Sequence, residues 1–194
     1  MERRTFLKTG AVGVAATTLA APAVAQDTRQ WKLVSAWPKN LPGPGVAAQT
    51  LADRITTLSG GRIEVKLYAA GEIVPGRGVF DAVSEGTAEL YHAVPAYWGS
   101  KSKGILLFGS QPFGLTADEQ FGWMTHGGGQ ELYDEMYGRF GIKPFLCGNS
   151  GPQWGGWFRN EIKSVEDLKG LKFRTTGLAS EMANKLGMAA ESMS

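Results

Sequence analysis

The chain has 194 residues, of which 43% are hydrophobic and 20% charged, a composition typical of a globular protein with an ordinary core. Lys and Arg number 20 against 18 Asp and Glu, and without residues 1–25 the balance is 17 against 17. No basic run and no apolar segment of membrane-spanning length follows residue 25, so the pattern supports neither nucleic-acid binding nor a membrane span.

The first 25 residues have the pattern of a secretory signal. Residues 3–8 read R-R-T-F-L-K, which matches the twin-arginine core R-R-x-F-L-K. Residues 23–25 read A-V-A, an A-x-A cleavage site, so we expect the mature chain to begin at Gln26. An ordinary secretory signal with a chance arginine pair is the alternative. Both interpretations place the protein outside the cytoplasm, and we predict the periplasm, reached by the twin-arginine route.

The segments that follow alternate between strand and helix patterns. Residues 31–37 and 62–71 predict strands, the second by its alternation of apolar and polar residues. Residues 46–61 have apolar residues at helical spacing and end in glycine, which predicts a helix. Residues 79–93 predict a helix and then a third strand. Strands that alternate with helices in this way indicate a parallel sheet with right-handed crossovers.

The rest of the chain begins with a long, aromatic, Gly-rich connection at 95–116. Beyond it we predict helices at 117–125, 130–139 and 178–186, strands at 142–148, 153–160 and 171–174, and one helical turn that opens at Ser164–Asp167. Cys147 is the only cysteine, and its place at the apolar end of a predicted strand indicates a buried side chain. A strand pattern begins after Gly187 and has no successor, so we interpret the chain as truncated.

Five residues at predicted strand ends and loops could form a ligand site: Tyr97, Trp98, Asn149, Gln153 and Arg174. A guanidinium matches a carboxylate with parallel donors, and amide oxygens can ligate a hard cation. Spacing alone also allows a solvated strand-end arginine, core-packing aromatics and amides that serve turns. The glycine run at 127–129 is no phosphate loop, because it follows no strand and its helix begins with carboxylates.

Several stretches are specific enough to indicate a family. The twin-arginine signal, WKLVSAWPKNLPGPG (31–45), GGGQELYDEMY (127–137), GNSGPQWGGWF (148–158) and DLKGLKFRTTG (167–177) together resemble the substrate-binding receptors of TRAP transporters. They are most similar to the branch that binds 2-oxo and 2-hydroxy acids such as pyruvate or lactate. The resemblance covers nearly all of residues 1–186. It implies an α/β, periplasmic-binding-protein-like fold of two lobes that close over the ligand, with the first lobe mostly present and the second incomplete.

The resemblance also implies roles for the five residues. Arg174 would bind the ligand carboxylate, Gln153 would contact both the ligand and a bound cation (sodium or calcium), and Tyr97 and Trp98 would line the pocket. Asn149 is a weaker correspondence. The family often has Met-Pro or Thr-Pro after the arginine, where this chain has Thr175-Thr176.

The resemblance further implies the domain organisation and the partners. We expect a signal peptide at 1–25, an N-terminal α/β lobe at 26–150 and the start of a second α/β lobe at 151–194. The expected partners are a small organic-acid anion and the membrane subunits of a TRAP transporter, with a homodimer in the full-length form. The family's chain continues for about as long again as this one and supplies further cation ligands and a swapped dimer helix.

The expected function is therefore that of a transport receptor, with no enzymatic activity and no catalytic cofactor. An exported enzyme with an α/β fold is the alternative, but the sequence contains no Cys/His cluster, dinucleotide fingerprint or nucleophile elbow. A non-functional truncated receptor is the third interpretation.

Overall fold

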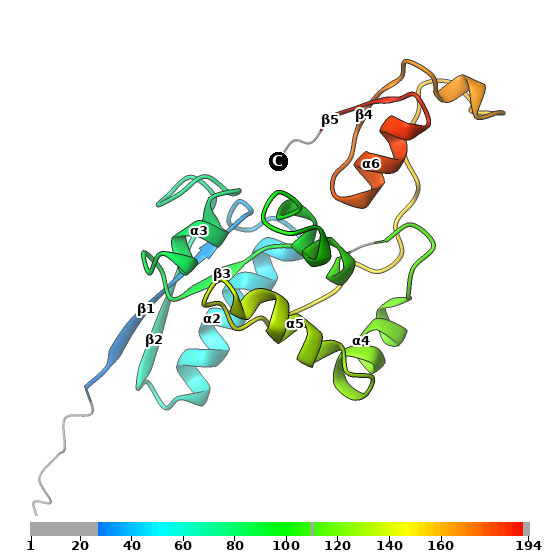
Figure 1. Cartoon of the computed structure of the whole chain (residues 1–194). Helices are drawn as coiled ribbons and strands as arrows, with labels where there is room; N and C mark the ends of the chain where they lie inside the picture. The colour runs from blue at the N-terminus through cyan, green and yellow to red at the C-terminus, as the bar shows by residue number, and fades with distance from the viewer. Residues whose placement is uncertain (1–26, 110, 192–194) are drawn as a thin grey trace, which may run out of the picture.

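The computed structural model describes residues 27–109 and 111–191, so the predicted signal peptide lies outside the described residues. Two groups of elements follow one another along the chain (Figure 1). The first group contains β1 (Arg29–Ser35), α2 (Pro44–Leu58), β2 (Ile63–Tyr68), α3 (Val79–Ser84), β3 (Leu90–His92), η1 (Pro95–Tyr97), η2 (Lys103–Phe108), α4 (Ala117–His126) and α5 (Gly129–Gly138). The second group contains η3 (Glu166–Leu168), β4 (Lys172–Arg174), α6 (Leu178–Lys185) and β5 (Ala189–Glu191).

The first group is built on a parallel sheet with the strand order β2-β1-β3. Consecutive residues of the central strand, Leu33 and Val34, are 0% and 2% exposed. Because side chains alternate between the two faces of a strand, β1 is covered on both sides, as expected for a sheet with helices on each face. The predicted strand–helix–strand–helix–strand order and its parallel pairing are confirmed.

One face of this sheet is covered by α2. Ala48 and Ala52 lie one turn apart on the helix, are fully buried, and pack against Leu33 of β1 and against Val65 and Leu67 of β2. Their small side chains allow the helix to lie close to the sheet. The other face carries the larger core, to which α3, η2, α4 and α5 contribute the buried residues Val79, Phe80, Ile105, Phe108, Met124, Tyr133 and Tyr137.

The second group is a smaller unit in which β4 and β5 pair in parallel and α6 connects them. Phe173 of β4 stacks on Phe158, with ring centroids 5.4 Å apart and planes 6° from parallel. Figure 1 shows this unit beside the first one, at the end of a long connection drawn in yellow and orange. The strand expected at 171–174 and the helix expected at 178–186 are both present to within a residue.

Two expected strands are wrong. Residues 142–148 and 153–160 are described, and neither contains a strand. Pro144 has no N–H to donate to a ladder, and its carbonyl accepts a hydrogen bond of 2.9 Å from Nε2 of Gln130 in α5. This segment is therefore attached to a helix side chain rather than to a sheet edge. Cys147 also lies in this segment and is exposed, so the expectation of a buried side chain is wrong.

Candidate functional site

The carboxyl ends of β1, β2 and β3 lie at one edge of the first sheet. In the order β2-β1-β3, the connection after β1 leads to β2 on one side of the central strand, and the connection after β2 crosses to β3 on the other side. Open α/β sheets hold ligands at the carboxyl ends of the strands, at the point where the strand order reverses in this way. The connections are tied together at this edge, since the Ala70 N–H donates to the Trp37 carbonyl at 3.1 Å and Lys39 pairs with Glu72 at 3.1 Å. The Ala69 N–H and the Lys39 ammonium hold the pKa of Glu72 below its usual value.

The second sheet reaches the same edge. The Thr176 hydroxyl, just beyond β4, donates a hydrogen bond of 3.3 Å to the carbonyl of Ala96 in η1, 80 residues earlier in the chain. Gly177 lies against Ala96 so closely that a Cβ placed on it would be 3.2 Å from the Ala96 Cβ. An ion pair between Lys103 and Glu181 also links η2 to α6. The carboxyl end of β4 therefore meets the connection that follows β3.

Tyr97 and Trp98 differ in their surroundings although they are adjacent. Tyr97 is half-buried at the sheet edge, whereas Trp98 is only 3% exposed and lies in the larger core. The Trp98 ring is 5.3 Å from Phe80 and 6.2 Å from Tyr91, and it meets Tyr97 edge-on at 6.0 Å. The structure thus places Tyr97 where it can line a site, and the buried Trp98 ring packs against it.

Arg174 ends β4 with an exposed side chain. Its register partner in β5 is Glu191, and the Thr175 N–H donates to the Glu191 carbonyl at 3.1 Å. Thr176, two residues beyond Arg174, makes the contact with Ala96 described above. The structure therefore brings the strand end that carries Arg174 to the residue that precedes Tyr97.

Asn149 and Gln153 lie in the long connection between the two groups and are exposed. The Asn149 Oδ1 accepts the Gly151 N–H at 2.7 Å, which is the local turn bond that Asn commonly makes. The Gln153 Nε2 donates to the Ser150 hydroxyl at 2.9 Å. These bonds are local and fit the interpretation that both amides serve turns. The Oε1 of Gln153 is the atom that a cation would use.

A group of three or more His, Cys, Asp or Glu side chains suited to a metal ion does not occur within residues 27–109 and 111–191. Neutral amide and carbonyl oxygens suit a hard cation such as sodium or calcium, and Gln153 is of that type. The donor chemistry of this residue therefore fits the expected cation.

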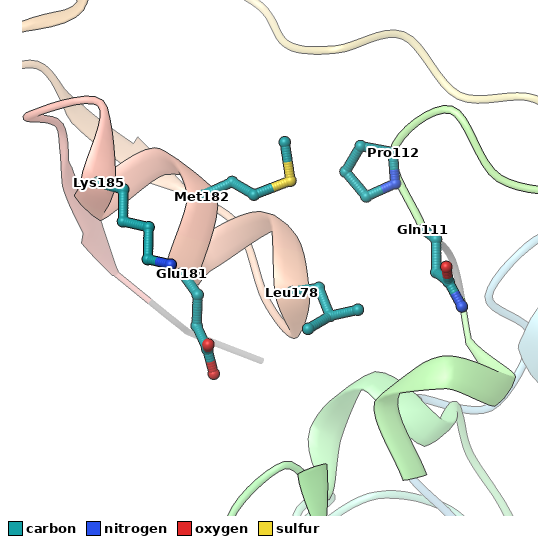
Figure 2. Close-up of a pocket in the computed structure, with 6 residues that line it drawn as sticks. All are labelled: Gln111, Pro112, Leu178, Glu181, Met182 and Lys185. Atoms are coloured by element: carbon teal, nitrogen blue, oxygen red, sulfur yellow. The ribbon is translucent and has the colours of Figure 1, made fainter. Parts of the chain in front are cut away.

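A shallow hollow of about 270 Å³ lies between the two groups. Figure 2 shows α6 on one side of it and the connection after η2 on the other, with the lining residues Gln111, Pro112, Leu178, Glu181, Met182 and Lys185. None of the five predicted site residues lines this hollow. Its lining combines apolar groups with one acidic and one basic side chain and does not present the arginine and aromatic wall expected for an organic acid.

Sequence reasoning missed two residues at the sheet edge. The Arg77 guanidinium carbon lies 5.1 Å from the centre of the Tyr97 ring, and His92 is buried at the end of β3 with its ring 5.0 Å from that of Trp37. Burial lowers the pKa of His92 and so favours its neutral imidazole. His92 ends β3 and Arg77 lies in the connection that follows β2, so both lie at the same edge as Tyr97. This position at or after a strand end is the sequence feature that could have identified them.

Comparison with known proteins gives two matches to family models. Residues 34–194 match the bacterial extracellular solute-binding protein, family 7, and residues 1–20 match the signal sequence of the twin-arginine translocation pathway. The part of the chain that the structure describes contains no helix long and apolar enough to cross a membrane.

Three similar proteins are informative. A monocarboxylate 2-oxoacid-binding periplasmic protein of Nostoc is 39% identical over 97% of this chain and 54% of its own. A TRAP periplasmic solute-binding protein of Pseudoalteromonas atlantica, solved with sodium and pyruvate, is 40% identical with a TM-score of 0.83 over 86% of this chain and 50% of its own. Its counterpart from Colwellia psychrerythraea, solved with calcium and pyruvate, is 38% identical with a TM-score of 0.83 over 86% and 51%. The chain thus spans about half the length of these relatives.

Proposed function

Because this chain belongs to the bacterial extracellular solute-binding proteins of family 7, we propose that it is the substrate-binding receptor of a TRAP transporter. It captures a small 2-oxo or 2-hydroxy monocarboxylate, such as pyruvate, together with sodium or calcium. The observation that carries this proposal is the similarity, at 40% and 38% identity, to receptors solved with pyruvate and one of these cations. The name of the Nostoc relative supports the same class of ligand.

The residue roles follow from the chemistry of each side chain. Arg174 binds the ligand carboxylate with two parallel N–H donors, the pairing that a planar guanidinium makes best. Tyr97 forms an aromatic wall at the edge of the first sheet, with Trp98 packed behind it. Gln153 contacts the ligand and contributes its amide oxygen to the cation, and Asn149 orders the same connection. The cation supplies positive charge for the oxygens of the bound acid.

The protein is exported by the twin-arginine route to the periplasm, as predicted from residues 1–25. The family consists of substrate-binding transport proteins. We infer that this protein has no enzymatic activity and no catalytic cofactor, and that it delivers its ligand to TRAP membrane subunits. We assign residues 26–150 to the first lobe and 151–194 to the second, and expect a homodimer in a chain of the relatives' length.

Calorimetric titration of pyruvate into the purified chain, with sodium, with calcium and with neither, tests this proposal. We expect pyruvate to bind more tightly in the presence of one cation, because the ligand and the cation share the Gln153 side chain. Lactate should bind at the same site and compete with pyruvate. Absence of pyruvate and lactate binding under all three conditions would contradict the proposal, and turnover of either acid would favour an exported enzyme.

A further inference from the structure

Arg77 and Tyr97 form a contact at the carboxyl edge of the first sheet. The guanidinium carbon lies 5.1 Å from the centre of the Tyr97 ring, within the range of a cation–π interaction. Both side chains are half-buried, so the contact is partly shielded from water. Such a contact restricts the ring and places a permanent positive charge beside it.

The fold brings Arg77 to this position through the residue before it. A Cβ placed on Gly76 would lie 2.7 Å from the carbonyl oxygen of Ala36, so only glycine allows this approach to the end of β1. The Gly78 N–H donates to the Pro75 carbonyl at 2.7 Å and closes a turn around Arg77. The connection after β2 therefore lies over the end of the central strand and presents Arg77 toward the connection after β3.

The second group also contacts the connection after β3. The Thr176 hydroxyl bonds the carbonyl of Ala96, and Ala96 precedes Tyr97. The Ala96–Tyr97 segment is thus contacted by Arg77, from the connection after β2, and by Thr176, two residues beyond Arg174 at the end of β4. Because the chain beyond residue 25 has equal numbers of basic and acidic residues, attraction of an anion to this place must come from local charges and not from net charge.

We propose that Arg77 is a positioning residue of the ligand site, which fixes the ring of Tyr97 and steers a small carboxylate toward Arg174. The identity of the ligand, a 2-oxo acid, rests on the proposed function. Arg77 contributes mainly to the association rate, because a positive charge at the rim of a site attracts the approaching anion before it binds.

The test compares Arg77→Gln, Arg77→Lys and Lys66→Gln by stopped-flow fluorescence with pyruvate at several salt concentrations. Lys66 is a matched control, since its ammonium also lies 5.1 Å from a tyrosine ring, that of Tyr68, but it belongs to β2 and not to the connection that contacts Tyr97. We expect Arg77→Gln to slow association at low salt by about threefold or more, and to make it less sensitive to salt. Arg77→Lys keeps the charge and should restore most of the rate, and Lys66→Gln should match the wild type.

Equal association rates and equal salt dependence in the wild type and Arg77→Gln would overturn the inference. If the wild type does not bind pyruvate, the proposed function fails, and Arg77 is then tested with acetate as a bare carboxylate, by NMR of the full chain. A shift of the Tyr97 amide signal on adding acetate, present in the wild type and lost in Arg77→Gln, would support steering. A shift that is absent, or the same in both proteins, would contradict it.

Discussion

At the scale of single residues, the carboxyl edge of the first sheet has a charged side chain, Arg77, and a buried imidazole, His92. Arg77 and Tyr97 contact one another there, while His92, at the end of β3, is only 6% exposed and its ring packs against Trp37. A second proton would place a charged imidazolium in this buried position, and burial disfavours the charged form. The protonation of His92 therefore links the stability of this edge to pH.

We expect the free energy of unfolding to fall as the pH drops below about 6.5. Burial lowers the pKa of His92 in the folded protein, whereas the unfolded chain takes up a proton near its ordinary value of 6.5. The unfolded state therefore binds more protons in the interval between the two values, and stability is lost by at most about 1.4 kcal/mol per pH unit there. Urea unfolding from about pH 5 to pH 8 measures this slope.

The matched variants are His92→Gln, which removes the titrating group, and His126→Gln at the exposed end of α4. The slope between about pH 5 and pH 6.5 should flatten in the first variant and persist in the second. An unchanged slope in His92→Gln would assign the effect to other groups.

At the scale of elements, local sequence signals determine most of the helices and their ends. α4 begins with a complete capping box, in which the Glu119 carboxylate accepts the Thr116 N–H at 2.8 Å and the Thr116 hydroxyl accepts the Glu119 N–H at 3.4 Å. α2 begins with Pro44 after Gly43, whose φ is +82°, and so uses backbone geometry in place of a side-chain cap. The two helices thus start by different means, both readable in the sequence.

Replacement of Thr116 by alanine should destabilise the protein by about 1 kcal/mol, because it removes the side-chain half of the capping box. Thr125→Ala is the control, since the Thr125 hydroxyl bonds the Phe121 carbonyl within the same helix at 2.7 Å and caps nothing. Thermal unfolding of the two variants compares them directly. A loss of stability as large in Thr125→Ala as in Thr116→Ala would show that the cap is not the cause.

Periodicity was sufficient to predict α2, β2 and α6, whose observed bounds lie close to the predicted ones. It failed for residues 142–148, whose apolar pattern predicts a strand while Pro144 is attached to Gln130 of α5. Whether an extended segment joins a sheet depends on a partner strand, and local sequence does not contain that information. The candidate site follows the same rule, because strand ends suggested Tyr97 and Arg174 as site residues, but the contact of Thr176 with Ala96 joins positions 80 residues apart and could not be predicted from local sequence.

At the scale of the whole molecule, the fold is α/β and resembles periplasmic binding proteins, as predicted. The chain spans about half the length of its relatives. Its two parallel sheets meet where the end of β4 contacts the connection after β3. The central claim is that Arg174, carried to this meeting point by β4, binds the carboxylate of a small 2-oxo acid.

The most direct measurement of that claim is calorimetric titration of pyruvate, with calcium present, into the wild type, Arg174→Ala and Lys172→Ala. Lys172 is exposed on the same strand, two residues earlier, and controls for the loss of a positive charge from β4. We predict that the wild type and Lys172→Ala bind with similar affinity and that Arg174→Ala binds at least about 30-fold more weakly, because the bound carboxylate loses its charge partner. Pyruvate binding by Arg174→Ala with the affinity of the wild type would contradict the account.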